Sequence, residues 1–454
     1  MRIPLAPPSL ADLMDQISGD RFVEIVTQLQ TGPYDAKGRY LHWDKLRHLP
    51  QRNGLTAQEC WLGMRMARNS MAQLLPFSDK QACPFRFTQP AGVLRELSWI
   101  GQNATGSVRA DAAITDPKTK DTYLISSLIE EAITSSQLEG AATTRRVAKD
   151  MIRSGRKPRD HSEQMIYNNY NAMQFIRDYA DEAVTPDFIF ELHRLLTIDT
   201  LAAEDKDKAG AFRSQADQII VSSADNKVLH IPPAASELSG RLQAVCDFIN
   251  DDSSDSLNYI HPVIKAIVVH FMIGYDHPFV DGNGRTARAL FYLVLAKAHY
   301  WLIEYISISR VIKKSPGRYL QAYLHTETDG GDVTYFIIHQ LEVICQAIND
   351  LHSYLIDKTR ELNEARNLLD NSALKDRLNH RQLTLINNAL SNPGMEYTVS
   401  SHMKSHATAY QTARSDLLEL SDELGVLRRY KAGKKMVFVA PPDLGDLVSR
   451  ISDS

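Results

Sequence analysis

The stretch from His277 to Arg288, His-Pro-Phe-Val-Asp-Gly-Asn-Gly-Arg-Thr-Ala-Arg, constrains this chain more than any other segment. Gly282 and Gly284 permit backbone conformations that a Cβ disfavours, so successive N–H groups can converge on an anion. The apolar residues after Arg285 predict a helix, and its N-terminus adds positive dipole to the same loop. Arg285 and Arg288 are three residues apart and share one helical face. A base, a carboxylate, a flexible turn and two cations together indicate phosphate chemistry.

At every defining position this stretch matches His-Pro-Phe-x-Asp-Gly-Asn-Gly-Arg-x-x-Arg, the signature of the Fic family. The chain therefore resembles a Fic-type nucleotidyltransferase, a family whose usual reaction is AMPylation, the transfer of AMP from ATP to a protein hydroxyl. The resemblance implies a mainly α fold, with a Fic-type helical core and a β-hairpin flap. It also implies ATP as the substrate and Mg²⁺ as the metal.

Two residues of the signature are suited to the chemical step. A Ser, Thr or Tyr hydroxyl is a weak nucleophile at neutral pH, and His277 has an ordinary pKa near neutrality, so it can take the hydroxyl proton. Asp281 offers the hard oxygen ligand that Mg²⁺ prefers, with phosphate oxygens and waters completing the shell. The resemblance assigns these residues as general base and metal ligand. Phe279 is expected to be buried and to anchor the loop.

The rest of the signature is expected to bind phosphate. The resemblance implies that Gly282, Asn283 and Gly284 hold the α- and β-phosphates, with the Asn283 side chain donating to the α-phosphate. Arg285 and Arg288 would bind the β/γ end, where a forked and permanently charged donor is more effective than lysine.

Three further residues near the loop need an interpretation. Asp276 stands where an apolar residue usually precedes the signature, and it could interact with His277 or face solvent, of which we favour solvent. His261 and His270 lie in the apolar helix predicted before the loop. We interpret them as helix-end or core histidines and leave them out of the site.

A second pattern lies upstream, in residues 121–140. Paired apolar residues every four positions predict an amphipathic helix. Its end, Ser135-x-x-x-Glu139-Gly140, resembles the inhibitory motif of Fic proteins that carry their brake N-terminal to the catalytic loop. The resemblance implies that Glu139 pairs with Arg288 and occupies the place that would orient the γ-phosphate.

Between the two patterns, residues 218–231 contain two short β-prone runs around a polar turn, which predict a hairpin. A plain surface hairpin is the simplest interpretation. The preceding Gly210–Arg213 segment resembles the Fic flap region, which docks a target segment as an added strand. The resemblance thus implies a target protein at this hairpin, and self-modification is a further possibility.

Composition and simple sequence patterns argue against several other classes of protein. At 454 residues, two to three folding units are expected. The charged content of 23% and net charge of −4 argue against a protein coated with nucleic acid. Four scattered cysteines, without Cys-x-x-Cys, indicate neither a disulfide framework nor a zinc site. Early prolines interrupt any signal core and no apolar run is long enough to span a membrane, so we expect a cytoplasmic protein without membrane contact.

The domains are predicted from changes in pattern along the chain. We expect an N-terminal helical extension over 1–110, to which no chemistry is assigned, and a Fic core over 111–355. A charged helical linker is expected over 356–376. Residues 377–454 are expected to form a winged helix-turn-helix-like domain, with the wing formed by the β-prone strand near Val437.

The C-terminal domain has mixed charge. The basic residues of the wing suit phosphate contacts; they are Arg428, Arg429, Lys431, Lys434 and Lys435. Tyr410, Gln411 and Arg414 are expected to face outward at the start of the recognition helix. Four acidic residues oppose DNA if they share that face; they are Asp416, Glu419, Asp422 and Glu423. DNA binding is therefore possible but not favoured, and we prefer protein binding or homodimerisation.

Two function classes compete at this stage. The first is an AMP transferase autoinhibited by Glu139, and the second is a DNA-binding regulator whose Fic core senses nucleotide. An intact His277 and both arginines favour the enzyme, because a sensor needs no general base. The same loop could also use another phosphate-containing donor or remove AMP again.

Overall fold

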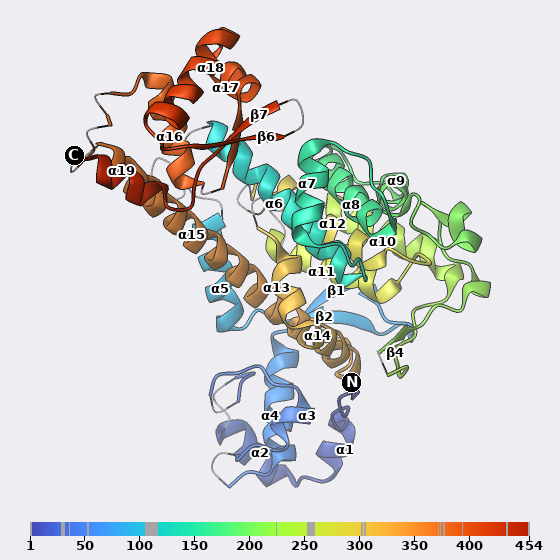
Figure 1. Cartoon of the computed structure of the whole chain (residues 1–454). Helices are drawn as coiled ribbons and strands as arrows, with labels where there is room; N and C mark the ends of the chain where they lie inside the picture. Colours follow the sequence, from blue (N-terminus) through green and yellow to red (C-terminus); the bar gives the residue numbers. More distant parts are fainter. Residues whose placement is uncertain are drawn as a thin grey trace. The chain divides into compact units, whose positions relative to one another are not determined.

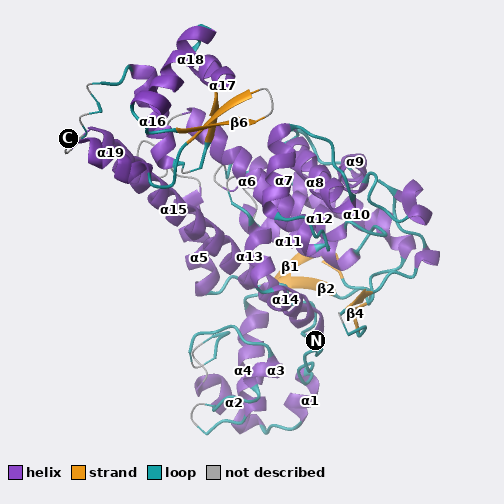
Figure 2. Ribbon diagram, viewed as in Figure 1, coloured by secondary structure: helices purple, strands orange, loops and turns teal. Residues whose placement is uncertain are grey.

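A computed structural model of the chain is drawn in Figure 1. It describes residues 2–28, 32–35, 37–51, 54–104, 117–223, 225–251, 259–300, 303, 306–370, 372, 374–375, 377–392, 394–432 and 435–452. The described residues form two compact units, one ending at Leu351 and one beginning at His352. Both units are mainly helical, and the few strands form hairpins or one small sheet (Figure 2). The expected mainly α fold is confirmed.

The N-terminal part of the first unit is a set of short helices followed by a β-hairpin and a longer helix. The elements are α1 (Leu10–Asp15), α2 (Gly19–Gln28), α3 (Trp43–Leu46), α4 (Ala57–Ser70), β1 (Gln73–Ser78), β2 (Pro84–Phe87) and α5 (Ala91–Ala104). α4 begins with a capping box, in which Thr56 and Glu59 each accept a hydrogen bond from the other's backbone N–H. The antiparallel hairpin β1–β2 was not predicted from the sequence.

The remainder of the first unit is a helical core with one hairpin. Its helices are α6 (Pro117–Leu138), α7 (Arg145–Ser154), α8 (His161–Asp178), α9 (Pro186–Thr197), α10 (Leu238–Asn250), α11 (Pro262–Asp276), α12 (Asn283–Lys297), α13 (Ile308–Lys314) and α14 (Pro316–Thr328). Short 3₁₀ turns cover Ala203–Lys208, Gln215–Asp217 and Ala235–Glu237. Strands β3 (Val221–Ser222) and β4 (Val228–His230) pair antiparallel, so the predicted hairpin is confirmed.

α11 is the buried centre of this core. Its apolar side chains are almost fully enclosed, as expected for a helix that is hydrophobic all round. His261 caps its N-terminus by accepting from the Val263 N–H, and His270 is buried with Nε2 at 2.8 Å from the Tyr319 hydroxyl. The interpretation of these two histidines as helix-end and core residues is confirmed.

α6 is positioned by its apolar stripe. Ile129, Ala132 and Ile133 are fully buried and form one core cluster with Met165 and Ile166 of α8. Burial of such side chains contributes on the order of 1.5–3 kcal/mol each. This packing fixes the C-terminal end of α6, and therefore residues 135–140, against the rest of the core.

The long helix α15 covers Thr334–Asp370. Asp332 caps it by accepting from the Thr334 N–H at 3.1 Å. The helix continues to Asp370, through most of the linker predicted over 356–376.

The second unit follows the element order helix, strand, helix, helix, hairpin, helix. The elements are α16 (His380–Ser391), β5 (Glu396–Thr398), α17 (Val399–His406), α18 (Tyr410–Leu418), β6 (Arg428–Ala432), β7 (Lys435–Val439) and α19 (Leu444–Ser452). The strands form one antiparallel sheet in the order β5-β7-β6. The buried Asp416 joins three helices by accepting from Asn379, Arg381 and His402. Strand β5 was not predicted, and Lys434 lies outside the described residues.

Candidate functional site

The signature loop connects α11 to α12, the two helices that form the centre of the core. His277 ends α11 in a left-handed backbone conformation, with φ +46°. Its Nδ1 lies 3.1 Å from the Gly274 carbonyl oxygen, a contact that requires a proton on Nδ1 and leaves Nε2 as the basic nitrogen. Burial lowers the pKa of His277 below its ordinary value, although the Gly274 carbonyl opposes this shift. The imidazole is therefore neutral at pH 7, the form a general base needs.

A cavity of about 310 Å³ opens beside this histidine. The loop from His277 to Gly284 forms one side, and Tyr319 and Tyr323 of α14 form another. Val221 and Leu229 of the β3–β4 hairpin complete the rim, as do Glu139 and Arg288. The volume and the mixture of aromatic and charged groups suit a small polar ligand with a planar ring.

Two residues outside the signature hold the loop in place. Arg213 donates from Nε to the His277 carbonyl at 2.7 Å, and its backbone N–H donates to the Pro278 carbonyl at 2.9 Å. His193 stacks on Phe279 at 3.8 Å and contacts the Asp281 carbonyl through Nε2 at 2.8 Å. Phe279 is fully buried, as predicted. Sequence reasoning missed His193, because a lone histidine on a helix carries no recognisable signal.

The Asn283 side chain restrains the loop through two hydrogen bonds to the loop backbone. Its Oδ1 accepts from the Phe279 N–H at 2.9 Å, and its Nδ2 donates to the Phe279 carbonyl at 2.8 Å. Gly282 has φ +81°, and a Cβ there would lie 2.7 Å from Thr197 Cγ2. The turn is therefore held by its own backbone contacts and has no room for a side chain at position 282. In this structure the Asn283 side chain is engaged by the loop backbone, whereas the sequence prediction placed it on a phosphate.

The two arginines of the signature have different surroundings. The Arg285 side chain is fully buried, donating to the Leu196 carbonyl at 2.8 Å and to Asp281 at 3.2 Å. It does not line the cavity. Arg288 does line the cavity, and its guanidinium is bound by residues of α6. Arg285 therefore contacts the loop through Asp281, whereas Arg288 lines the cavity.

The predicted pair between Glu139 and Arg288 is present. Arg288 Nη2 lies 2.7 Å from Glu139 Oε1, and Arg288 also donates to the Ser135 hydroxyl at 2.9 Å and to the Ser135 carbonyl at 3.1 Å. Gly140 follows in a left-handed conformation, φ +96°, and the chain turns away. A Cβ at Gly284 would collide with Glu139 Oε1. The carboxylate therefore lies directly over the loop at the N-terminus of α12.

The electrostatics of Glu139 follow from this position. Burial by itself raises the pKa of the carboxyl, but the charge and hydrogen bond of Arg288 outweigh burial, and the pKa of Glu139 lies below its ordinary value. Its side chain keeps 28% of its surface exposed, against 3% for Arg288. An ionised carboxylate thus occupies an anion-binding position formed by a helix N-terminus and an arginine.

Asp276 does not face solvent, so our preferred interpretation of this residue was wrong. The side chain is buried and pairs with Arg241 at 2.7 Å, and Arg241 also donates to the Ser78 carbonyl. Burial raises the pKa of Asp276 to about 6, although Arg241 opposes the shift. The sequence could not show this, because Arg241 lies 35 residues away on α10.

Asp281 is the one signature residue with an exposed side chain suited to a hard cation. Its carboxylate is 54% exposed and lines the cavity. Within the described residues no cluster of three or more His, Cys, Asp or Glu side chains is arranged to hold a metal. A single carboxylate fits Mg²⁺, which usually binds one or two carboxylates together with phosphate oxygens and water.

Comparison with known proteins assigns a family to this part of the chain. Residues 183–295 match the model of the Fic/DOC family, so the chain carries a Fic/DOC domain. The protein adenylyltransferase Fic of Nematostella vectensis is 29% identical over 174 residues, 37% of each chain. That of Drosophila willistoni is 37% identical over 112 residues, 25% of this chain and 20% of its own length. The matches therefore span well under half of these relatives.

The fold comparison covers more of the chain. A crystal structure of a Fic family protein from Desulfovibrio desulfuricans G20 superimposes with a TM-score of 0.51 over 77% of this chain and 96% of its own, at 17% identity. At that identity the likeness establishes the fold alone. Among the described residues, no helix is both long and apolar enough to cross a lipid bilayer.

Proposed function

We propose that this chain is a protein adenylyltransferase that transfers AMP from ATP to a Ser, Thr or Tyr hydroxyl, and that Glu139 inhibits it. The observation that carries the proposal is the Glu139 carboxylate, which lies over Gly284 and pairs with Arg288 beside a neutral His277. A preformed phosphate position occupied by an internal anion is what an autoinhibited phosphate-transfer site needs. The Fic/DOC match supports the same reaction class.

The mechanism assigns one task to each group. The target hydroxyl oxygen attacks the α-phosphorus, the bond from that phosphorus to the bridging oxygen breaks, and pyrophosphate leaves. His277 Nε2 takes the hydroxyl proton. The Gly282–Gly284 turn and the α12 N-terminus hold the α- and β-phosphates through backbone N–H groups. Asp281 would hold Mg²⁺, which supplies charge neutralisation on the phosphates.

The inhibition acts through Arg288. With Glu139 in place, the guanidinium is committed to a carboxylate and to Ser135, so it is not free for the γ-phosphate. ATP then lacks one of the contacts that align the α-phosphate with an incoming hydroxyl. A misplacement of the reacting groups by about 1 Å can cost on the order of 10²-fold in rate. The loss of this one arginine contact is therefore sufficient to inhibit transfer.

The β3–β4 hairpin is our proposed docking place for the target segment. Ile220, Val228 and Ile231 are between 42% and 54% exposed on it, and a two-stranded ribbon has open edges on both sides. An extended peptide can add to such an edge through main-chain hydrogen bonds. The hairpin also borders the cavity through Val221 and Leu229, so a docked strand would bring its hydroxyl near His277.

The direct test is transfer itself. Purified protein is incubated with lysate and isotope-labelled ATP, and mass spectrometry identifies any AMP-modified residue, including residues of the chain itself. A pre-modified target incubated with the same protein measures AMP removal. Release of AMP without transfer would favour deAMPylation, and labelling from a different donor would favour another phosphate-containing substrate.

We propose in addition that the second unit is a winged helix with a weak affinity for DNA. Three of the four acidic residues that argued against DNA have partners within the unit. Asp416 is buried and paired with Arg381, and Glu419 accepts from Gln382. Asp422 pairs with Arg429 on β6. Arg414 and Lys431 are exposed, and neither pairs with an acidic side chain among the described residues.

A gel shift with the full chain tests this second function. We expect weak binding to duplex DNA at low salt that is lost near physiological salt, because phosphate contacts release counterions. Lys431→Gln should weaken it further. Tight and sequence-selective binding at physiological salt would instead support the regulator class, and no binding at low salt would leave protein binding or dimerisation as the role of this unit.

A further inference from the structure

The helix that carries Glu139 also carries a buried carboxylate about two turns earlier. Glu131 of α6 is 2% exposed, and no arginine or lysine pairs with it in the described part of the chain. Glu131, Ser135 and Glu139 are each four residues apart, so they follow one stripe of the helix. The proposed inhibition uses Ser135 and Glu139 and leaves Glu131 without a role.

The Glu131 carboxylate is held by hydrogen bonds from the segment that begins α13. Its Oε2 accepts from the Ser307 hydroxyl at 2.7 Å and from the Ser309 backbone N–H at 3.2 Å, and its Oε1 accepts from the Ser309 hydroxyl. Ser309 is fully buried and Ser307 is 8% exposed. A carboxylate is costly to bury unless donors satisfy it. These donors therefore fix α6 to the start of α13 at Glu131.

Tyr292 of α12 is attached to the same segment. The Ile308 N–H donates to the Tyr292 hydroxyl at 3.0 Å, and that hydroxyl donates to the Ile306 carbonyl at 3.3 Å. Tyr292 is buried and lies one helical turn after Arg288. Residues 306–309 are thus bonded both to α6, through Glu131, and to α12, through Tyr292.

The inhibitory contact joins the same two helices. Arg288 of α12 donates to the Ser135 hydroxyl, to the Ser135 carbonyl and to Glu139. Ser135 lies one turn after Glu131 on α6, and Arg288 lies one turn before Tyr292 on α12. The attachments to residues 306–309 are therefore one helical turn from the Arg288–Ser135 contact on each helix. They set the register of α6 along α12.

Two further contacts join the last turns of α6 to α13. Thr134 Oγ1 lies 3.0 Å from the Ser307 hydroxyl, and the Lys313 ammonium group donates to the Gln137 side chain. Thr134 also donates to a carbonyl of its own helix, and Lys313 is exposed, where water competes for the contact. Glu131 is therefore the principal attachment between the two helices.

We propose that Glu131 is a positioning residue for the inhibition, because it holds the end of α6 in register with α12 so that Ser135 and Glu139 reach Arg288. This inference rests on the proposed function, since it concerns the regulation of the same site. Glu131 does not line the cavity, so it acts through the helix. Without this attachment the end of α6 shifts, and Glu139 occupies Arg288 only part of the time.

Glu131→Gln tests this role in transfer. The variant keeps the shape of the side chain but replaces one acceptor oxygen with an NH₂ group, which cannot accept from a serine. We expect AMP transfer to rise about 10-fold over the wild type, less than in Glu139→Gly because Glu139 is still present. In the Glu139→Gly background the same change should alter transfer by less than about twofold, since no carboxylate is left to position. A fall in transfer in both backgrounds would show a structural role only and overturn the inference.

Hydrogen exchange measures the position of the helix end without any transfer. The backbone N–H groups of Glu139, Gly140 and Ala141 donate to carbonyls of residues 136 and 137. We expect Glu131→Gln to speed exchange in a peptide covering residues 135–141 by about 10-fold. Unchanged exchange in this peptide would overturn the inference. Faster exchange together with a Glu139→Gly variant that transfers no more AMP than the wild type would contradict the proposed function instead, and the positioning of α6 by Glu131 would stand.

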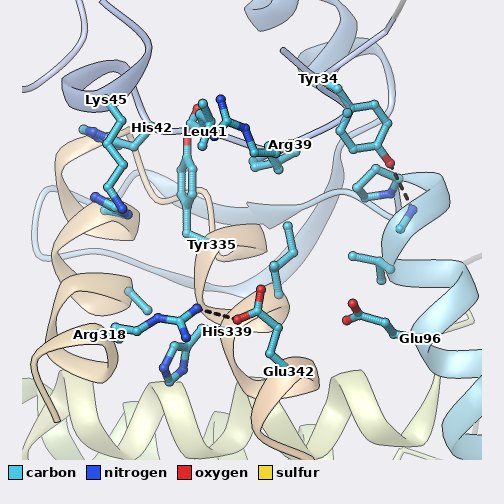
Figure 3. Close-up of a pocket in the computed structure, with 18 of the residues that line it drawn as sticks. Tyr34, Arg39, Leu41, His42, Lys45, Glu96, Arg318, Tyr335, His339 and Glu342 are labelled. Atoms are coloured by element: carbon cyan, nitrogen blue, oxygen red, sulfur yellow. Dashed lines mark hydrogen bonds and ion pairs between the residues drawn. The ribbon is translucent and has the colours of Figure 1, made fainter. Parts of the chain in front are cut away.

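Two control variants separate this role from a general loss of stability. Glu163 of α8 is 3% exposed and pairs with Arg156 at 2.7 Å, so Glu163→Gln removes an equally buried carboxylate that is not on α6. Glu342 of α15 pairs with Arg318 of α14 at 2.6 Å on the lining of a separate cavity (Figure 3). Glu342→Gln therefore removes an attachment of the helix that follows α13. Neither control should raise transfer or speed exchange over residues 135–141, and an equal effect of Glu163→Gln would overturn the inference.

Ser309→Ala provides a milder variant in case Glu131→Gln does not fold. It removes one hydroxyl donor and keeps both the carboxylate and the backbone N–H that donates to it. We expect transfer to rise about threefold and exchange over residues 135–141 to become faster, because one of the hydrogen bonds that hold Glu131 is lost. A folded Ser309→Ala protein with wild-type transfer and wild-type exchange would contradict the role of Glu131.

Discussion

The signature loop and the inhibitory end of α6 meet at the same cavity, but they are held in very different ways. Separate contacts from Arg213, His193 and Asn283 restrain the loop, and most of them go to its backbone. The inhibitory contact depends on one carboxylate, Glu139, at the exposed end of a helix, and on its single pairing with Arg288.

This difference distinguishes the restrained signature loop, which is a permanent part of the site, from the Glu139–Arg288 contact, which can be removed. Loss of one brace leaves the loop with others, and none of the braces depends on Glu139. The Glu139 side chain is partly exposed, so its withdrawal would leave a formed loop and a free Arg288. The comparison predicts that changes in the loop abolish or weaken transfer, while a change at Glu139 starts it.

The largest loss is expected for His277→Ala in the Glu139→Gly background. Removal of a general base typically costs on the order of 10²–10⁴-fold in rate, and the phosphates are held by other groups, so ATP affinity should remain near that of the parent. Transfer of labelled AMP and calorimetric binding of ATP measure the two effects. Labelling close to that of the parent would remove this histidine from the mechanism.

A smaller loss is expected for Arg213→Met in the same background. The change removes donors to the His277 and Asp276 carbonyls, so the base shifts even though it is still present. We expect transfer to fall by up to about 10²-fold, with a lower melting temperature. Arg194→Met is the matched control, because Arg194 is exposed and its one ion pair among the described residues is with Glu191. Equal effects of Arg213→Met and Arg194→Met on transfer and on the melting temperature would show that the loop does not need the Arg213 contacts.

The smallest effect on the transfer rate is expected from a change of pH. Burial lowers the pKa of His277 below its ordinary value of 6.5, so the neutral, basic form of the ring is present at neutral pH. That form is lost as the pH falls through the lowered pKa. Glu139→Gly removes a nearby negative charge that raised this pKa, so the pKa should move further down in the variant. The pKa of Glu139 lies below 4.5, so acidification from pH 8 to 5 should not release the wild-type inhibition. A rate profile over that range checks both statements.

Much of the candidate site could be predicted because its residues are close in sequence or carry a recognisable spacing. The turn at Gly282, the helix after it and the Glu139–Arg288 pair all follow from two short motifs. The prediction failed where a partner was distant. Asp276 was expected at the surface because nothing near it in sequence reveals Arg241.

The fold likewise contains elements that could be predicted from the sequence and elements that could not. The helix after the signature loop, α12, and the helix that ends just before Glu139, α6, were predicted because their apolar residues repeat with a helical period. The short strands β1, β2 and β5 were not, because each depends on a partner strand more than on its own composition.

The most direct test of the account is the transfer activity of Glu139→Gly beside the wild type and the double variant Glu139→Gly with Arg288→Ala. Removing the carboxylate frees Arg288 and opens the position over Gly284, so we predict a gain in auto- or target-AMPylation on the order of 10²-fold. The double variant should return to the low level of the wild type, because the freed guanidinium is gone. If Glu139→Gly transfers no more AMP than the wild type, the end of α6 is not a brake and the central claim is contradicted.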